Sequence, residues 1–249
     1  MDLELHGRVA IVTGASRGLG SAIVRAFSLE GMQVVAAARS ESDLHRLAAD
    51  APSPVHVAVC DVGDPTAAAR LVDIALDAFG GLDVVVNNAG IAPAASFTDM
   101  PNEEWERILS VNLLAPVALA RSAGPVLLGQ GHGKVINVAS TSGLRGKPTL
   151  AAYSASKGAL LRFTEALAGE WAPANVQVNA IAPGAFATDA QQAVLDDPTV
   201  LTRRLRKIPA GRMGGADEIG PLACFLASPR SAFITGATYV IDGGEAAKL

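Results

Sequence analysis

Short apolar segments alternate along the chain with longer amphipathic segments. Each apolar segment is four to six residues long, is rich in Val and Ile, and shows no alternation with polar residues. Such runs are typical of strands that are covered on both faces of a sheet. We therefore predict seven strands, at residues 9–13, 33–38, 55–60, 82–87, 134–139, 176–181 and 238–241.

The amphipathic segments between these strands predict helices at residues 18–30, 41–50, 64–79, 101–129, 152–172, 190–206 and 216–227. Strand–helix–strand alternation with right-handed crossovers produces a parallel, doubly wound sheet with helices on both faces. Pro116 and Pro125 fall inside the fourth helical segment, and we expect them to kink or shorten it. No Pro- or Ser-rich linker divides the chain, so we predict one α/β domain over residues 1–249 with a three-layer αβα architecture.

Composition excludes several classes of protein. Half of the 249 residues are apolar, 18% are charged, and the net charge is −4. These values argue against a disordered chain and against a nucleic-acid-binding protein that works through a basic surface. The two cysteines, Cys60 and Cys224, form no disulfide framework and have no metal-ligand spacing, so we expect no metal site.

The N-terminal segment and the hydropathy of the chain bear on its location. The first residues are acidic and lack a basic region, so we expect no signal peptide. We find no apolar run that approaches the roughly 18 residues of a membrane span. The sequence therefore predicts a cytoplasmic protein with no membrane and no nucleic-acid partner.

Distinctive residues stand directly after the ends of the predicted strands. In open α/β sheets, ligands bind beyond the carboxyl ends of the strands, and these ends meet at one edge. Six segments fall there, namely 14–20, Arg39, Asp61, 87–90, Ser140 and 183–184. We predict a binding site at this edge of the sheet.

A glycine-rich loop, Thr13-Gly-Ala-Ser-Arg-Gly-Leu-Gly20, joins the first strand to the first helix. Glycines permit a tight turn and a close approach of phosphate, and the following helix N-terminus offers free N–H donors. The spacing differs from the common dinucleotide fingerprint, and no Lys-Ser/Thr pair follows it as in a P-loop. A turn required only for packing is the alternative interpretation.

The end of the second strand discriminates between cofactors. An acidic residue there would bind the ribose hydroxyl of NAD, whereas an arginine suits the 2′-phosphate of NADP. This chain has Arg39 and no acid there, and Arg17 offers a second planar guanidinium. We predict a preference for NADP(H) over NAD(H), with two solvated surface arginines as the alternative. Asp61 could accept from the adenine amino group or cap a helix.

Tyr153 and Lys157 lie four residues apart at the start of the fifth predicted helix, so they share one face. A nearby ammonium lowers the pKa of a phenol from about 10, which makes the tyrosine a usable acid/base. Ser140, at the end of the fifth strand, could hold a substrate oxygen as charge develops. The alternative is an amphipathic helix whose lysine extends to the surface.

Together these motifs resemble the short-chain dehydrogenase/reductase family over essentially the whole chain. The matching elements are TGASRGLG (13–20), NNAG (87–90), Asn112, Ser140, the Tyr153/Lys157 pair, and Pro183-Gly184 with Thr188. The resemblance implies a Rossmann-type fold with a seven-stranded parallel sheet. It also implies reversible hydride transfer between NAD(P)(H) and a carbonyl/alcohol pair.

The resemblance assigns roles to four catalytic residues. Tyr153 is the acid/base, Lys157 lowers its pKa and binds the nicotinamide ribose, Ser140 polarises the carbonyl, and Asn112 positions a water. The predicted cofactor contacts are Gly14, Ser16, Arg17, Gly18, Leu19, Gly20, Arg39, Asp61, Val62, Asn88, Ala89, Gly90, Tyr153, Lys157, Pro183, Gly184 and Thr188.

Substrate choice is expected to lie in a lid at about residues 185–214 and in the loop 141–149. The basic residues of these segments either attract an anionic substrate or form a solvated face; they are Arg145, Lys147, Arg203, Arg204, Arg206 and Lys207. Segments 170–172, 181–189 and 208–212 resemble sugar-acid (gluconate/deoxygluconate-type) members of the family. The 3-oxoacyl-thioester reductases share much of this pattern.

The resemblance also implies assembly into a homotetramer or a homodimer through the helices at 101–129 and 152–172 and the C-terminal strand region. Residues 225–226 and 239–244 fit such a buried patch, and an intramolecular core is the alternative. A different class of function is a non-catalytic NADP(H)-binding sensor or scaffold module. Such a module requires the glycine loop but not Ser140, Tyr153, Lys157 and Asn112.

Overall fold

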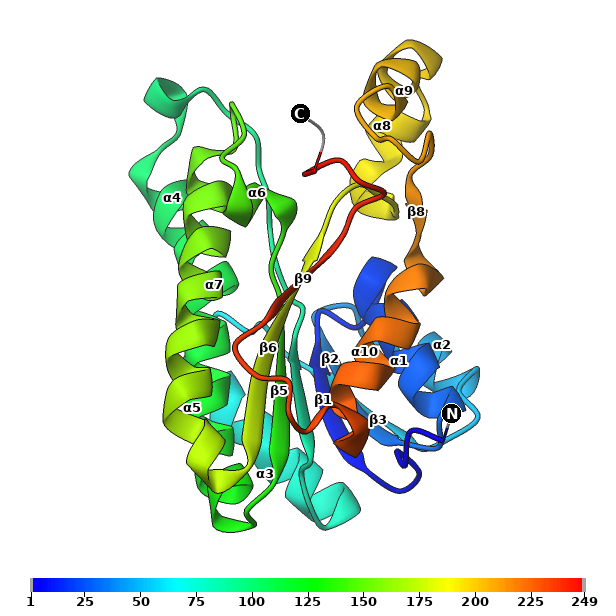
Figure 1. Ribbon diagram of the computed structural model, residues 1–249, viewed down its shortest axis with the longest axis vertical. Coiled ribbons are helices and arrows are strands. Elements are labelled where there is room, and N and C mark those ends of the chain that lie inside the picture. Colours follow the sequence, from blue (N-terminus) through cyan, green and yellow to red (C-terminus); the bar gives the residue numbers. More distant parts are fainter. Residues whose placement is uncertain (1, 248–249) are drawn as a thin grey trace.

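A parallel sheet of seven strands runs through the centre of the molecule in the computed structural model, which describes residues 2–247 (Figure 1). Its strands are β1 (Val9–Thr13), β2 (Gln33–Ala38), β3 (Val55–Val59), β4 (Val84–Asn87), β5 (Gly133–Val138), β6 (Val176–Pro183) and β9 (Thr238–Ile241). The order across the sheet is β3-β2-β1-β4-β5-β6-β9. The predicted doubly wound sheet is confirmed, and each strand lies within two residues of its predicted bounds. Met1, Lys248 and Leu249 of the predicted domain lie outside the described residues.

Helices cover both faces of this sheet. One face carries α1 (Gly18–Leu29), α2 (Glu41–Ala49) and α10 (Gly220–Ala227), and the other carries α3 (Ala67–Phe79), α5 (Ala115–Gly129) and α7 (Ala151–Trp171) (Figure 1). Two apolar clusters fill the interfaces, one around Phe27 and Cys224 and the other around Leu127 and Trp171. The three-layer αβα architecture is therefore confirmed as well.

The fourth helical segment is not shortened by its prolines. The chain is helical from Asn102 to Gly129, through α4 (Asn102–Leu109), a π-helical turn (Ser110–Leu114) and α5. A proline inside a helix lacks the N–H that would bond four residues back. For Pro116 that acceptor is Asn112, within the π turn, whereas Pro125 lies inside α5, which continues through it.

This continuous helix contains an 18-residue window with a mean hydropathy of 1.5, so its length and composition would allow it to cross a membrane. No such segment was predicted from the sequence, and by length and composition that prediction is wrong. Leu119, Ala123 and Leu127 pack in the cluster between the sheet, α3 and α7. Only 39% of the window is buried, which leaves apolar surface on the outer side of the helix. We interpret the helix as a layer of the α/β fold.

The predicted helix at 190–206 is divided. A short 3₁₀ turn η4 (Asp189–Gln191) leads into α8 (Gln192–Leu195), and α9 (Pro198–Leu205) follows after a break. The Asp197 carboxylate accepts hydrogen bonds from the backbone N–H groups of Thr199 and Val200 and thus caps α9, which begins with Pro198. An Asp-Pro pair is a start signal for a helix, and the sequence analysis overlooked it.

Two unpredicted strands, β7 (Phe186–Ala187) and β8 (Gly214–Gly215), pair in parallel at the base of the predicted lid. The lid also has an apolar cluster of its own, built around Ala185, Ile208 and Met213. The shorter elements are the 3₁₀ turns η1 (Phe97–Asp99), η3 (Ala172–Ala174), η5 (Ala216–Ile219) and η6 (Pro229–Ser231), and the helix α6 (Thr141–Leu144).

Candidate active site

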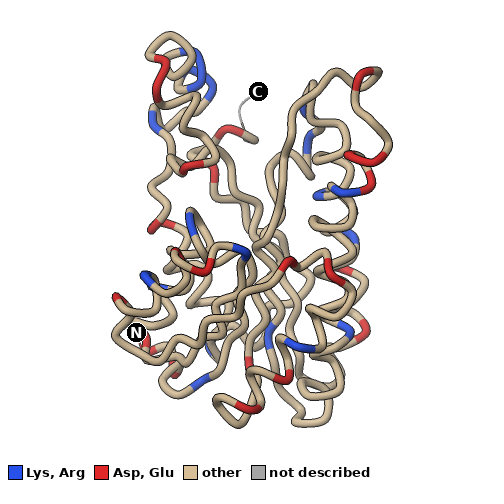
Figure 2. The backbone as a smooth tube through the Cα atoms, turned by 180° about the vertical axis from the view of Figure 1, so that it is seen from behind, with Lys and Arg blue, Asp and Glu red and all other residues tan. Residues whose placement is uncertain are grey.

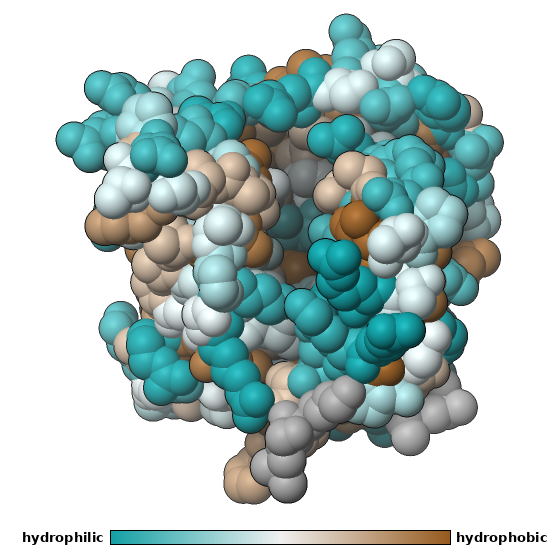
Figure 3. Space-filling model, turned by 90° about the horizontal axis from the view of Figure 1, so that it is seen from above, coloured by the Kyte–Doolittle hydropathy of each residue, from teal (hydrophilic) through white to brown (hydrophobic). Residues whose placement is uncertain are grey.

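A cleft of about 1350 Å³ opens at the carboxyl edge of the sheet, and it is visible from above as a hollow in the surface (Figure 3). All predicted cofactor contacts line it, from Gly14 in the glycine loop to Thr188 in the lid. Ser140 lines it too, whereas Asn112 is fully buried behind the surface. The structure thus brings together residues that span most of the chain.

The glycine loop depends on glycine for both its backbone and its packing. Gly14 and Gly18 have φ angles of +64° and +56°, a region that side chains disfavour. A Cβ atom on Gly20 would lie 2.2 Å from the carbonyl oxygen of Gly14. The loop is therefore required for packing, and it also presents the N-terminus of α1 to the cleft. Free N–H groups and the positive end of the helix dipole make this terminus suited to a phosphate.

The segment after β4 braces the glycine loop. The Asn88 side-chain amide donates to the carbonyl oxygens of Thr13 (2.9 Å) and Gly14 (3.1 Å). The Thr13 hydroxyl accepts in return from the backbone N–H groups of Asn88 and Ala89, both at 3.1 Å. These bonds fix the floor of the cleft on β1 and β4.

Arg17 and Arg39 supply positive charge at the cleft. Both side chains belong to exposed residues that line it, and within residues 2–247 neither guanidinium has a hydrogen-bond or ion-pair partner. The nearby Asp43 carboxylate is already engaged by the Ser40 hydroxyl (2.7 Å) and by Arg46 (2.6 Å). Two unpaired guanidiniums on one wall are suited to binding a phosphate.

Asp61 does not cap a helix. One of its carboxylate oxygens accepts from the backbone N–H of Gly63 at 2.9 Å, which fixes the turn after β3. The helix α3 begins later, at Ala67, with Thr66 at its N-cap position. The helix-cap alternative is therefore wrong, and Asp61 lies in the wall of the cleft.

Lys157 is 3% exposed, and its ammonium donates to the carbonyl oxygen of Val138 at 2.7 Å. The Nζ atom lies 6.0 Å from the centre of the Tyr153 ring. Burial lowers the pKa of Lys157 to about 8. The predicted placement of both side chains on one helix face is confirmed.

The Ser140 side chain acts on the Tyr153 phenol and lowers its pKa. Burial opposes this effect and is larger, so the pKa of Tyr153 is raised above its ordinary value. The expectation that Lys157 lowers this pKa is therefore not met, because the ammonium is held against the Val138 carbonyl and desolvation dominates. Ser140 also accepts from the backbone N–H of Ser142 at 3.0 Å.

Asn112 lies on the π turn, and its side chain connects two segments of the site. Its Oδ1 accepts from the backbone N–H of Ile91, while its Nδ2 donates to the Ile91 carbonyl and to the Ser156 hydroxyl. A Cβ atom on Gly90 would lie 3.4 Å from both Asn112 Oδ1 and Lys157 Nζ. Asn112 and Lys157 therefore flank Gly90 from two sides.

Several groups of the site were missed by the sequence analysis. The Val138 carbonyl and the backbone of Ile91 are main-chain partners, and no residue type reveals such a role. Ser156 had a sequence signal, since it lies between Tyr153 and Lys157. The cleft also contains side chains that no motif identified, among them Glu103 and Arg107.

The whole chain is similar to known enzymes. A family model described as enoyl-(acyl carrier protein) reductase matches residues 14–245. The 2-dehydro-3-deoxy-D-gluconate 5-dehydrogenase of Bacillus subtilis is 37% identical over 97% of this chain and 95% of its own length. The 3-oxoacyl-[acyl-carrier-protein] reductase FabG of Vibrio cholerae is 36% identical over 97% and 98%.

Solved structures agree with these relatives. A provisionally assigned NAD(P)-dependent gluconate 5-dehydrogenase from Beutenbergia cavernae, with bound NADP at low occupancy, has a TM-score of 0.93 and 35% identity, with both chains covered completely. A provisionally assigned 2-deoxy-D-gluconate 3-dehydrogenase from Agrobacterium tumefaciens, with bound NADP, has a TM-score of 0.91 and 35% identity over 99% of each chain. With its parallel seven-stranded sheet and its ordered set of motifs, this chain belongs to the short-chain dehydrogenase/reductase family of oxidoreductases.

Proposed function

We propose that the protein transfers a hydride reversibly between NADP(H) and the ketone or secondary alcohol of a small molecule. The observation that carries this proposal is that Ser140, Tyr153 and the buried Lys157 line the same cleft as the glycine loop. A non-catalytic sensor or scaffold would need the glycine loop, but it would not need a tyrosine, a serine and a buried lysine gathered in the same cleft. The catalytic function is therefore favoured over that alternative.

The site fits a dinucleotide, because an open helix N-terminus and two unpaired guanidiniums would be available to its phosphates in the cleft that Lys157 also lines. Thr188 lies against the glycine loop, since a Cβ atom on Gly18 would be 3.5 Å from its side chain. When bound, NADP(H) supplies the hydride chemistry. We propose that Tyr153 donates its phenolic proton to the carbonyl oxygen during reduction and that the Ser140 hydroxyl polarises this oxygen. The Ser140 hydroxyl, whose influence lowers the pKa of the phenol, would stabilise the phenolate that remains.

In this proposal Asn112 positions the site through its neighbours. Its three hydrogen bonds tie the loop after β4 to Ser156 on α7, one residue before Lys157. The water that the family resemblance implies at Asn112 stays a prediction, and so does the contact of Lys157 with the nicotinamide ribose.

We propose that Arg17 and Arg39 give a preference for NADP(H) over NAD(H). Their guanidiniums are unpaired within the described residues, and the end of β2 carries no acid that would take the ribose hydroxyl of NAD. Bound NADP in two similar structures supports the same cofactor.

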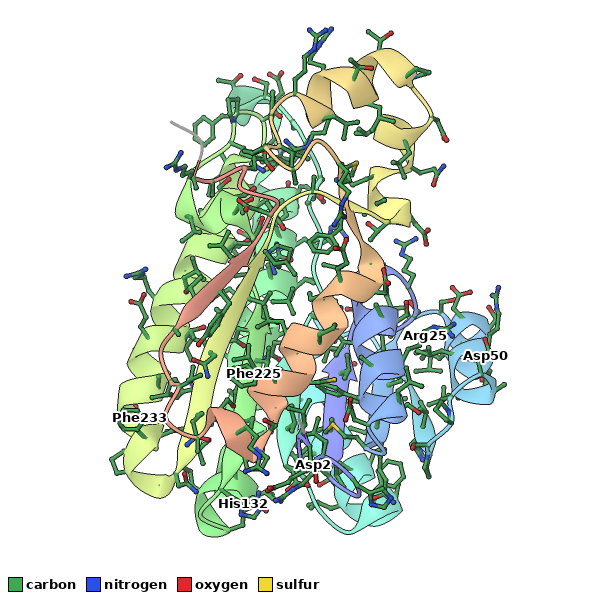
Figure 4. All side chains as sticks on the ribbon, turned by 45° about the vertical axis from the view of Figure 1, so that its right-hand side comes forward. Asp2, Arg25, Asp50, His132, Phe225 and Phe233 are labelled. Carbon is green, nitrogen blue, oxygen red and sulfur yellow. The ribbon has the colours of Figure 1, made fainter. Side chains whose placement is uncertain are left out.

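Arg39→Ala is expected to raise the Kd for NADPH by about 10- to 100-fold, the usual effect of losing a charge-assisted hydrogen bond. Binding of NADH should stay within about twofold, because NADH lacks the 2′-phosphate. The measurement is titration of both reduced cofactors by fluorescence. Arg25→Ala is the matched control, since Arg25 is exposed, pairs with Asp50 at 3.6 Å and lies outside the cleft (Figure 4). Unchanged NADPH affinity in Arg39→Ala would contradict the assignment.

For the substrate we propose a sugar acid of the gluconate type or a 3-oxoacyl group, bound under a lid formed by residues 185–214 and beside the loop 141–149. The names of the relatives support both classes. The experiment is a panel of sugar acids and acyl thioesters assayed with NADPH and with NADH by nicotinamide absorbance. Absence of any absorbance change with either class would contradict this substrate proposal.

We propose that the chain assembles as a homotetramer. An apolar 18-residue window of the helix at Asn102–Gly129 is only 39% buried, and Phe233 and Val240 are 103% and 46% exposed. Phe233 lies at the molecular edge remote from α8 and α9 (Figure 4). Leu226, which was predicted to belong to the interface patch, is 1% exposed and belongs to the internal core instead. A stable monomer in sedimentation velocity would contradict assembly.

We also propose a cytoplasmic location. Both cysteines, Cys60 and Cys224, are buried free thiols, as expected for a reducing compartment.

A further inference from the structure

The side of the cleft that α4 forms has no role in the proposed function. Glu103, Glu106 and Arg107 line the cleft from this helix, and Ser110 and Val111 line it from the π turn that continues the helix. Residues four positions apart share one helix face, so Glu103, Arg107 and Val111 form a row along the cleft. In two opposite views α4 lies across the molecule from the lid helices α8 and α9, and its acidic residues are visible in the second view (Figures 1 and 2).

The turn after β3 packs against the end of this row. A Cβ atom on Gly63 would lie 3.6 Å from Ser110 Oγ and 3.9 Å from Val111 Cγ2. Arg107 precedes Val111 by four residues, which corresponds to about 6 Å along the axis of an α-helix. Arg107 therefore stands about one helical turn beyond the contact between the β3 turn and the π turn.

Arg107 differs from Arg17 and Arg39 because its charge is compensated. Its Nε donates to Glu104 Oε2 at 2.9 Å, and its Nη2 donates to Glu104 Oε1 at 2.8 Å. This pairing raises the pKa of Arg107, and the Asp61 carboxylate adds to the effect. The two bonds fix the plane of the guanidinium and occupy one of its edges. A guanidinium held in this way is less suited to a phosphate, but its flat face can stack on an aromatic ring.

The charge of the surrounding wall also disfavours a phosphate. Within residues 2–247 the carboxylates of Glu103 and Glu106 have no hydrogen-bond or ion-pair partner. Asp61 and Asp64, on the turn after β3, line the same cleft. These carboxylates repel an anion, whereas an amino group on a neutral ring can donate to them. This end of the cleft is therefore suited to a neutral, flat base.

The proposed position of the 2′-phosphate directs the adenine to the same place. The ribose that carries this phosphate also carries the adenine, so a phosphate bound by Arg39 brings the base close to the end of β2. In the sheet β3 is the neighbour of β2, and the segment after β3 supplies Asp61 and Val62 to the cleft. The base would therefore lie over the turn after β3, beside α4.

We propose that the Arg107 guanidinium, held flat by Glu104, stacks on the adenine of the bound dinucleotide. The base then lies between this guanidinium and the turn that carries the partly buried Val62. The inference deepens the proposed function and rests on it for the identity of the cofactor. Arg107 binds NADP(H) and NAD(H) alike, in contrast to Arg39, whose proposed contact exists only with NADP(H).

The test measures the Kd values of NADPH, NADH and reduced nicotinamide mononucleotide, which lacks the adenosine half. All three are titrated by nicotinamide fluorescence, without substrate. Arg107→Met is expected to raise the Kd for NADPH and for NADH by the same factor, about 3- to 30-fold, the usual effect of losing a stacked cation. The Kd for the mononucleotide should stay within about twofold. Arg107→Lys should not restore the affinity, because an ammonium keeps the charge but has no flat face.

Arg162→Met is the matched control, because Arg162 also pairs with a glutamate three residues later, Glu165 at 2.7 Å, but on α7 and outside the cleft. All three Kd values should stay within about twofold in this variant, and thermal melting shows whether each variant is folded. The proposal is overturned if Arg107→Met weakens NADPH binding alone, weakens mononucleotide binding equally, or changes no Kd. Full recovery in Arg107→Lys would also overturn it, since charge alone would then suffice. The expected Kd pattern without reduction of any ketone would contradict the proposed function and leave the role of Arg107 in place.

Discussion

Tyr153→Phe is expected to lower kcat at least about 100-fold while the Kd for NADPH stays within about twofold. The substitution removes only the hydroxyl that would exchange a proton with the substrate oxygen, and it keeps the partly buried ring. Ser140 loses its phenolic partner but keeps the hydrogen bond from the Ser142 backbone that fixes its position. The loss should therefore appear in kcat rather than in cofactor binding.

Tyr239→Phe is the matched control, because the chain has only two tyrosines and Tyr239 lies on β9 outside the cleft. Its kcat should stay within about twofold of the wild-type value. A Tyr153→Phe enzyme with near-wild-type turnover would exclude Tyr153 as the proton donor.

The pH dependence of turnover should follow the titration of the same phenol. Burial raises the pKa of Tyr153, so the hydroxyl keeps its proton over a wider pH range and is ready to protonate a ketone at neutral pH. Reduction should therefore be level from about pH 6 to 8 and fall as the phenol deprotonates at higher pH. Oxidation requires the phenolate, so its rate should rise with pH. Steady-state rates in both directions measure this, and a reduction rate that falls from pH 6 would contradict it.

The central strands of the sheet could be predicted from sequence because they are buried on both faces, although the edge strands β3 and β9 are partly exposed. Uninterrupted runs of Val, Ile and Ala made β1, β2 and β9 recognisable at their observed bounds. The lid could not be predicted as well, since its strands β7 and β8 have two residues each and show no period. One continuous helix was predicted at 190–206, whereas the structure has two, because the N-cap role of Asp197 at the start of α9 was overlooked.

The sequence was sufficient to predict which residues at the sheet edge gather in the cleft, but not the pKa values of their side chains. Side chains placed after the strands identified the part of the cleft wall that the sheet edge forms, because the topology of a parallel sheet brings those positions together. The part formed by α4, with Glu103 and Arg107, was not identified. The four-residue spacing placed Lys157 on the face of Tyr153, yet it could not reveal that a main-chain carbonyl binds the ammonium. Burial then reversed the expected direction of the Tyr153 pKa, and burial depends on the packing of distant segments.

Gly143→Ala is expected to lower kcat by about 10- to 100-fold, although residue 143 takes no part in proton transfer. A Cβ atom at this position would lie 2.7 Å from the carbonyl carbon of Lys157 and 2.8 Å from its oxygen. Both atoms belong to the backbone of α7, so α6 must move away from α7. Ser140 caps α6 and would move with it, away from Tyr153. A displacement of about 1 Å in a catalytic group can cost about 100-fold in rate.

Alanine substitutions at two further glycines, Gly146 and Gly158, should lower kcat less, so the three variants form a graded series. At Gly146, in the same loop, an added Cβ would meet nothing within 4 Å, so Gly146→Ala should leave kcat within about twofold. At Gly158 the added atom would lie 3.3 Å from the Gly143 carbonyl oxygen, a milder clash from the opposite helix, and the loss should be intermediate. NADPH titration and thermal melting identify variants that are misfolded rather than misaligned. Equal kcat values for folded Gly143→Ala and Gly146→Ala enzymes would show that the spacing of α6 and α7 does not set the Ser140–Tyr153 geometry.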